Sequence, residues 1–153
     1  MSAPAECMDH LAAGIDTTGD GLTFLMHALS LPESGGVQTR LRAEISENAD
    51  VAFDRLPYLD AVVREGLRCF PPIPMSFPRC VPVGGRRLDG WWVPQGTIVS
   101  CQPWTIHRDE GIFPEAEKFK PERWVEASKE QRAEMDRMFF AFSQGGRGCI
   151  GKK

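Results

Sequence analysis

The fold is decided by a glycine-rich stretch at residues 142–151, which reads FSQGGRGCIG. Within it, residues 146–151 match the Gly-x-Gly-x-x-Gly spacing of a dinucleotide-binding loop. That loop needs a helix and a further strand after it, whereas only two lysines follow here. The glycine spacing therefore does not predict a dinucleotide site, and Cys149 becomes the informative residue of the stretch.

Cys149 stands among glycines, whose small size lets several backbone N–H groups approach one sulfur atom. Such N–H groups stabilise the charge of a thiolate, and a thiolate is a strong axial ligand of haem iron. Arg147, two residues earlier, can reach a haem propionate. Taken alone, these residues leave a second reading open, in which Cys149 is a free cysteine in a loop.

Composition narrows the class of protein. A chain of 153 residues suits one domain. The net charge of -3, from 18 Lys and Arg against 21 Asp and Glu, argues against nucleic-acid binding. No apolar run is long enough to span a membrane. The five cysteines contain no Cys-x-x-Cys pair, which disfavours a disulfide framework and a structural zinc site.

Working outward, the apolar pattern predicts mostly helices. Apolar side chains recur every three or four residues in three segments, which is typical of helices: 5–31, 37–48 and 57–69. The middle of the first, residues 13–19, has weak helical propensity and permits a local opening of the hydrogen-bond ladder. Ser128 and Gln131 have the spacing of a capping box and predict a further short polar helix.

The remaining segments read as strands and loops. Asp89-Gly90 is a strong turn signal and predicts a hairpin over 86–93. A further strand is expected at 97–101, and a loop anchored by aromatic side chains over 109–126.

Four motifs in order point to one family. Residues 142–151 resemble the haem-binding signature of the cytochrome P450 family, the haem-thiolate monooxygenases. Ala13–Thr18 (AGIDTT) resembles the family's oxygen-binding segment. Glu65–Arg68 (EGLR) resembles its E-x-x-R pair, and Pro121–Trp124 (PERW) resembles its P-E-R-F segment, with Trp in place of Phe. Each short motif is weak by itself, but four in this order are specific.

The resemblance implies a mainly α fold with a small β-sheet. It covers the C-terminal portion of the cytochrome P450 fold, truncated at both ends, so residues 1–153 are expected to form a single partial domain. The sequence of residues 142–151 looks most like that of fungal microsomal members of the family. An intact member would then lie at the endoplasmic reticulum membrane, whereas this chain, without an anchor or signal in its sequence, would be cytoplasmic.

The resemblance also assigns a haem site. The implied cofactor is haem b, with Cys149 as the axial ligand of its iron. Asp16 and Thr17 would be an acid–alcohol pair that delivers protons to dioxygen, although an ordinary helix start at Asp16 is the alternative. The other implied haem-binding residues are Gly14, Arg79, Phe142, Gly145 and Arg147.

A structural network is implied as well. Glu65 and Arg68 share a helix face, and in the family they join an arginine at the position of Arg123 behind the haem. Without the resemblance, the pair would read as a surface ion pair. His107 is either a weak contact of the haem propionates or a surface loop histidine.

The implied reaction is haem-dependent monooxygenation, the insertion of one atom of O2 into a small, lipophilic organic substrate. Electrons would come from an NADPH-dependent reductase, and fungal secondary metabolism is a common setting. The alternative is a catalytically inactive fragment that binds haem weakly or acts only through protein contacts.

Overall fold

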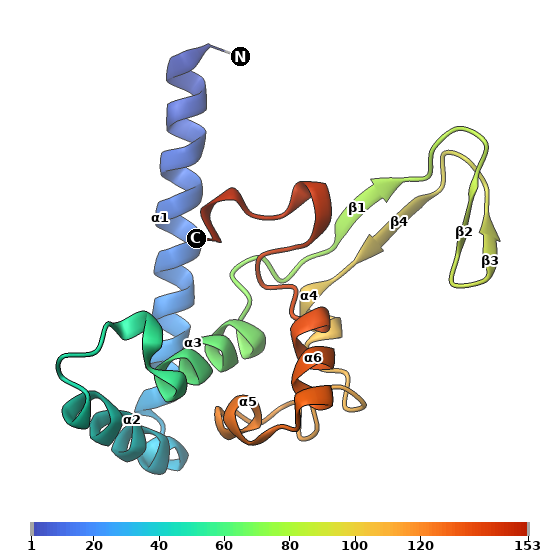
Figure 1. Ribbon diagram of the computed structural model, residues 1–153. Coiled ribbons are helices and arrows are strands. Elements are labelled where there is room, and N and C mark those ends of the chain that lie inside the picture. The colour runs from blue at the N-terminus through green and yellow to red at the C-terminus, as the bar shows by residue number, and fades with distance from the viewer. Residues whose placement is uncertain (1, 153) are drawn as a thin grey trace.

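The computed structural model describes residues 2–152, and it is mainly helical with two small antiparallel sheets (Figure 1). The long helix α1 (Ala3–Ser30) stands along one side, and α2 (Gly35–Glu47) and α3 (Pro57–Cys69) pack at its C-terminal end. They confirm the three helices that the apolar periodicity predicted. Short 3₁₀ turns connect them at Pro32–Ser34 and Phe53–Arg55.

Helix α1 is continuous through residues 13–19, so the weak segment neither opens the hydrogen-bond ladder nor starts a helix at Asp16. The Thr17 hydroxyl donates to the carbonyl of Ala13 at 2.7 Å, a bond within the helix. Because the helix extends on both sides of the weak segment, cooperative propagation outweighs the low propensity of a few residues.

Only the C-terminal end of α1 is anchored among the described residues. Leu25 and Ala28 are buried, and the Ser34 hydroxyl donates to the Ala28 carbonyl at 2.7 Å. Leu25 packs directly on Gly66 of α3, where an added Cβ would lie 2.8 Å from the Leu25 Cδ1 atom. Gly66 therefore lets α1 and α3 approach closely.

Helix α3 receives an N-terminal cap from another helix. Pro57 occupies its first turn, where a missing N–H costs nothing. The Glu44 carboxylate of α2 accepts from the backbone N–H groups of Tyr58 and Leu59, both at 2.8 Å. A carboxylate at this end also suits the positive pole of the helix dipole.

The strands form two separate pairs. The hairpin β2 (Arg86–Leu88) and β3 (Trp91–Val93) confirms the Asp89-Gly90 turn, whose residues have φ of 48° and 80°. Strand β4 (Ile98–Cys101) was expected, but its antiparallel partner β1 (Phe77–Cys80) was not. Proline at the second position of β1 masks the strand signal, and pairing with a distant segment forms it.

Three short helices complete the chain. The capping box of Ser128 and Gln131 is formed and begins α6 (Lys129–Met138). Helix α5 (Glu122–Glu126) lies within the segment expected to be a loop, and α4 (Pro103–Ile106) was not predicted. Helices this short carry too little periodicity to be read from a sequence. The final 3₁₀ turns are Gly145–Arg147 and Ile150–Lys152.

The core lies between α3 and the segments that follow it. One cluster centres on Phe113 and Trp124 and the other joins α1 to α3 through Leu25 and Val62. Among residues 2–152, no helix is long and apolar enough to cross a membrane. The C-terminal loop returns to lie beside α1 (Figure 1).

Candidate functional site: a buried ion network beneath a cysteine-lined cavity

The carboxylate of Glu65, on α3, is the centre of a fully buried polar network. Two of its donors are on Arg68, whose Nε and Nη2 atoms both lie 2.9 Å from it. The Arg123 Nε donates at 3.0 Å, and the backbone N–H of Lys120 donates at 2.9 Å. The structure thus brings Glu65, Arg68 and Arg123 together, as a buried network and not as a surface pair.

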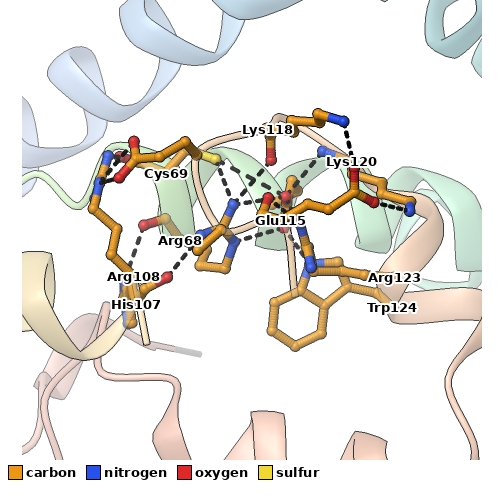
Figure 2. A network of polar contacts seen from close by, with 12 residues as sticks. Arg68, Cys69, His107, Arg108, Glu115, Lys118, Lys120, Arg123 and Trp124 are labelled. Carbon is orange, nitrogen blue, oxygen red and sulfur yellow. Dashed lines mark hydrogen bonds and ion pairs between the residues drawn. The ribbon is translucent and has the colours of Figure 1, made fainter. Parts of the chain in front are cut away.

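Trp124 supplies a fifth donor that sequence reasoning missed. Its indole Nε1 donates to the second oxygen of Glu65 at 2.9 Å. Figure 2 shows Trp124 and Arg123 on one side of Arg68, with His107 on the other. The available signal was the tryptophan itself, because phenylalanine at this position of the motif has no N–H to donate.

The cationic partners are themselves held by main-chain carbonyls. Arg68 Nη1 donates to the carbonyl of His107 at 2.7 Å, and Arg123 Nη1 donates to that of Pro114 at 2.6 Å. Burial alone would raise the pKa of Glu65, but the hydrogen bonds and charge of Arg68, with the charge of Arg123, hold that pKa below its ordinary value. The carboxylate is therefore ionised and fully partnered.

His107 is buried, so both expectations for it are wrong. It is not a surface histidine, because its exposed fraction is 0%. Neither ring nitrogen is free for a propionate: Nδ1 lies 3.0 Å from the Arg68 carbonyl oxygen, and Nε2 accepts from the Phe140 N–H at 2.8 Å. No local sequence pattern indicated the burial of His107, because both of its partners are distant along the chain.

A largely apolar cavity of about 430 Å³ separates α1 from the C-terminal loop. Thr17 lines one wall, and Phe142, Arg147 and Cys149 line the other. The remaining lining residues come from α1, α3, the segment that leads into the first residue of β1, and the C-terminal loop: Thr18, Gly21, Leu22, Leu25, Val63, Leu67, Pro72, Ile73, Phe77, Ala141 and Ser143.

The loop that carries Cys149 is closed by main-chain hydrogen bonds. The Cys149 N–H donates to the Phe142 carbonyl at 2.8 Å, and that of Gly148 donates to the Gly145 carbonyl at 3.0 Å. Gly145 has a φ of 68°, which favours glycine.

The expected cradle of N–H groups around the Cys149 sulfur is not formed. Within the part of the chain that the structure describes, this loop is held by main-chain hydrogen bonds and by one from the Gln144 side chain to the Arg137 carbonyl, and none reaches the sulfur. The chain enters the 3₁₀ turn Ile150–Lys152 directly after Cys149, and the cysteine side chain is exposed.

Several predicted site residues lie outside the cavity lining. Gly14 and Asp16 are exposed on α1, next to Thr17 but not in the wall. Arg79 is exposed on β1, where its guanidinium donates to the Pro78 carbonyl at 2.8 Å. Gly145 shapes the loop without lining the cavity. The structure thus brings Thr17, Phe142, Arg147 and Cys149 together in the cavity lining. Gly14, Asp16, Arg79 and Gly145 lie outside it.

Known proteins resemble this chain throughout. The family model described as Cytochrome P450 matches residues 2–153. The cytochrome P450 monooxygenase hkm5 of Aspergillus hancockii is 39% identical, covering 95% of this chain and 30% of that protein. The cytochrome P450 monooxygenase aneF of Aspergillus aculeatus is 41% identical, covering 91% of this chain and 29% of that protein.

Solved structures agree with the sequence comparisons. The retinoic acid-bound cyanobacterial CYP120A1 superposes with a TM-score of 0.76 at 28% identity, covering 92% of this chain and 32% of that one. The chain belongs to the cytochrome P450 family. It spans about 30% of the length of the curated relatives it matches.

Membership in this family implies a haem group, and the residues around the cavity fit one. The apolar walls suit the faces of a porphyrin, Cys149 offers a sulfur donor for iron, and Arg147 offers a cation for a carboxylate. This donor set is the one the sequence predicted, now grouped in a single cavity.

Proposed function

We propose that the whole protein is a haem-dependent monooxygenase whose cysteine ligand is Cys149. The observation that carries the proposal is the position of Cys149 and Thr17 on facing walls of one apolar cavity. In the reaction, one atom of O2 enters a C–H bond of the substrate and the other leaves as water, using two electrons and two protons. The haem, as haem b, supplies the iron at which O2 is activated.

The chain's own residues hold the cofactor and exclude water. Phe142 and the leucines of α1 and α3 would cover the porphyrin, Arg147 and Arg79 would neutralise its propionates, and Gly14 would leave space beside it. Gly145 gives the cysteine loop its turn. Glu65, Arg68 and Arg123 hold α3 against the segment behind the haem and take no part in the chemistry.

Thr17 and Asp16 move protons in this proposal. The Thr17 hydroxyl donates to Ala13, which leaves its oxygen able to accept a hydrogen bond from the cavity side. Asp16, exposed to solvent next to it, takes up protons and passes them on as a carboxylate can.

The substrate class and partners follow from the family and the cavity. The apolar lining of the cavity favours a small lipophilic organic molecule as the substrate. The family favours an NADPH-dependent reductase as the electron donor. The named fungal relatives favour secondary metabolism as the setting and the endoplasmic reticulum membrane as the location. Residues 1–153 would form one partial domain of that enzyme.

The decisive experiment is an absorption spectrum of the haem-loaded, reduced protein under carbon monoxide. The unmodified protein is expected to give the strongly red-shifted Soret band of thiolate ligation, and Cys149→Ser is expected to lose it. Cys101→Ser, which changes another exposed cysteine, is the matched control and keeps the band. A red-shifted band that survives in Cys149→Ser would overturn the assignment.

Thr17→Ala is expected to keep that band while a larger share of electrons ends in peroxide instead of product. Asp16→Asn is expected to slow turnover, because an amide cannot relay a proton. Measuring product and peroxide per electron consumed tests both roles. Full coupling in Thr17→Ala would contradict the proton-delivery role, and no haem binding at all would favour an inactive fragment.

A further inference from the structure

His107, at the end of α4, is a buried titratable residue that the proposed chemistry does not use. Its ring stacks on Phe139 with 5.5 Å between ring centroids and meets Phe113 edge-on at 6.2 Å. A side chain of this polarity, fully enclosed among aromatic rings, needs a compensating role for its two nitrogens.

Both nitrogens of His107 bond to main-chain groups from different parts of the chain. Nδ1 faces the Arg68 carbonyl oxygen at 3.0 Å, so it carries the proton. Nε2 receives the Phe140 N–H at 2.8 Å, so it is unprotonated. The contacts fix one neutral tautomer, and an added proton on Nε2 would set one donor against another.

Phe140 is where the chain leaves α6 and turns toward the cavity. Its carbonyl accepts from the Ser143 N–H at 2.9 Å, and the Phe142 carbonyl accepts from the Cys149 N–H at 2.8 Å. The bond from the Phe140 N–H to His107 thus stands at the start of a short series of main-chain hydrogen bonds that ends at Cys149.

We infer that His107 is a positioning residue, which ties the end of α3 to the start of the cysteine loop and so sets where Cys149 lies in the cavity. The consequence for the haem ligand rests on the proposed function. The link that His107 makes between Arg68 and Phe140 does not depend on the proposed function.

The charges around His107 favour its neutral form. Burial, with the charges of the Arg68 and Arg108 guanidiniums, lowers the pKa of His107 to about 4, although the bond to the Arg68 carbonyl and the Glu65 carboxylate oppose this shift. The tie is therefore intact at neutral pH and is released when the pH falls through about 4.

NMR of the haem-loaded protein tests the tie directly. The imidazole nitrogens of His107 are expected to show the Nδ1–H tautomer, and the Phe140 amide is expected to be protected from hydrogen exchange at neutral pH. An Nε2–H tautomer, or a Phe140 amide that exchanges at the rate of an open loop, would overturn the inference.

Three variants separate the tie from simple packing. His107→Gln keeps an acceptor near the place of Nε2, His107→Asn keeps only a donor near Nδ1, and His107→Phe keeps only the stacked ring. Protection of the Phe140 amide is expected to fall by about tenfold in the Asn and Phe variants, the factor for one lost hydrogen bond. His107→Gln is expected to retain most of it.

His27→Gln, at an exposed position of α1, is the matched control and leaves the Phe140 amide unchanged. If His107→Phe does not fold, the comparison of Gln with Asn still decides, and equal protection in those two contradicts the tie. The fraction of haem that shows the thiolate-type spectrum should likewise be higher in His107→Gln than in His107→Asn and His107→Phe. Loss of spectrum in Cys149→Ser is a separate result, so the two proposals can fail independently.

Discussion

At the scale of single residues, Glu65 shows how a buried charge is made tolerable. Its two oxygens accept five hydrogen bonds from nitrogen, from Arg68 twice, Arg123, Trp124 and the Lys120 backbone, and a sixth from the Cys69 thiol at 3.9 Å. A carboxylate removed from water is costly unless each lone pair finds a donor. The tryptophan in the PERW motif adds a donor where the family pattern has phenylalanine.

Trp124→Phe isolates that added donor, because the ring stays in the core while the indole N–H is lost. Stability is expected to fall by about 1.5–3 kcal/mol, the range for a hydrogen bond to a charged group. Denaturant unfolding measures the change.

Trp91→Phe is the control for that substitution, since Trp91 is 77% exposed and should change stability little. Equal stability in Trp124→Phe and the unmodified protein would mean that the indole contact contributes nothing.

Part of this network was predictable. The i,i+3 spacing puts Glu65 and Arg68 on one helix face, and the PERW motif indicates Arg123 as a partner. The contacts of Trp124, His107 and the Lys120 backbone depend on how α3, α4 and α5 pack, which no local pattern encodes. The exposure of Asp16 and Arg79 was likewise invisible, because a motif names residue types and not the walls they reach.

At the scale of elements, the crossing of α1 and α3 depends on one glycine. An added Cβ at Gly66 would lie 2.8 Å from Leu25 Cδ1 and 3.4 Å from both its Cβ and Cγ. The tip of a leucine can rotate away, but its Cβ moves only with the helix. A side chain at position 66 therefore pushes α1 from α3.

Gly66→Ala is expected to destabilise the protein by about 1–3 kcal/mol, as overpacking in a core does. Gly36→Ala, in the first turn of α2 with no atom within 4 Å of the added Cβ, is the control and should be neutral or mildly stabilising. Thermal or denaturant unfolding compares the two, and similar effects from both would refute the close-contact argument.

Most of the helices and strands could be predicted from the sequence. Periodicity and end signals place the three longer helices and α6, and a turn dipeptide places the hairpin β2–β3. Strand β1 was missed because its sequence, Phe77–Cys80, contains a proline and is stabilised by pairing with β4. The weak middle of α1 does not interrupt the predicted helix, since a long helix tolerates a short unfavourable segment.

At the scale of the whole molecule, α1 carries an apolar face that the rest of the described chain does not cover. Met8, Leu11, Ile15 and Met26 are each at least 60% exposed, whereas Leu25 on the same helix is buried against α3. Contiguous exposed apolar surface promotes association.

The 153-residue chain by itself is therefore expected to self-associate, and sedimentation over a range of concentrations measures it. Replacing Met8 and Leu11 together by lysine should reduce the association without touching the core. A chain that stays monomeric with a cooperative melt would contradict this expectation.

Because α1 is packed against the rest of the described chain only toward its C-terminal end, the helix can tilt around that end. Leu25 packs on Gly66, and one turn further along the helix Gly21 lies against Leu67 and Pro72. Thr17 is four residues beyond Gly21, about 6 Å at 1.5 Å per residue. A tilt of α1 by about 5° around Gly21 would move Thr17 by about 0.5 Å. A side chain added at Gly66, inside the E-x-x-R motif, is therefore expected to change the distance between Thr17 and Cys149, although α3 holds neither residue.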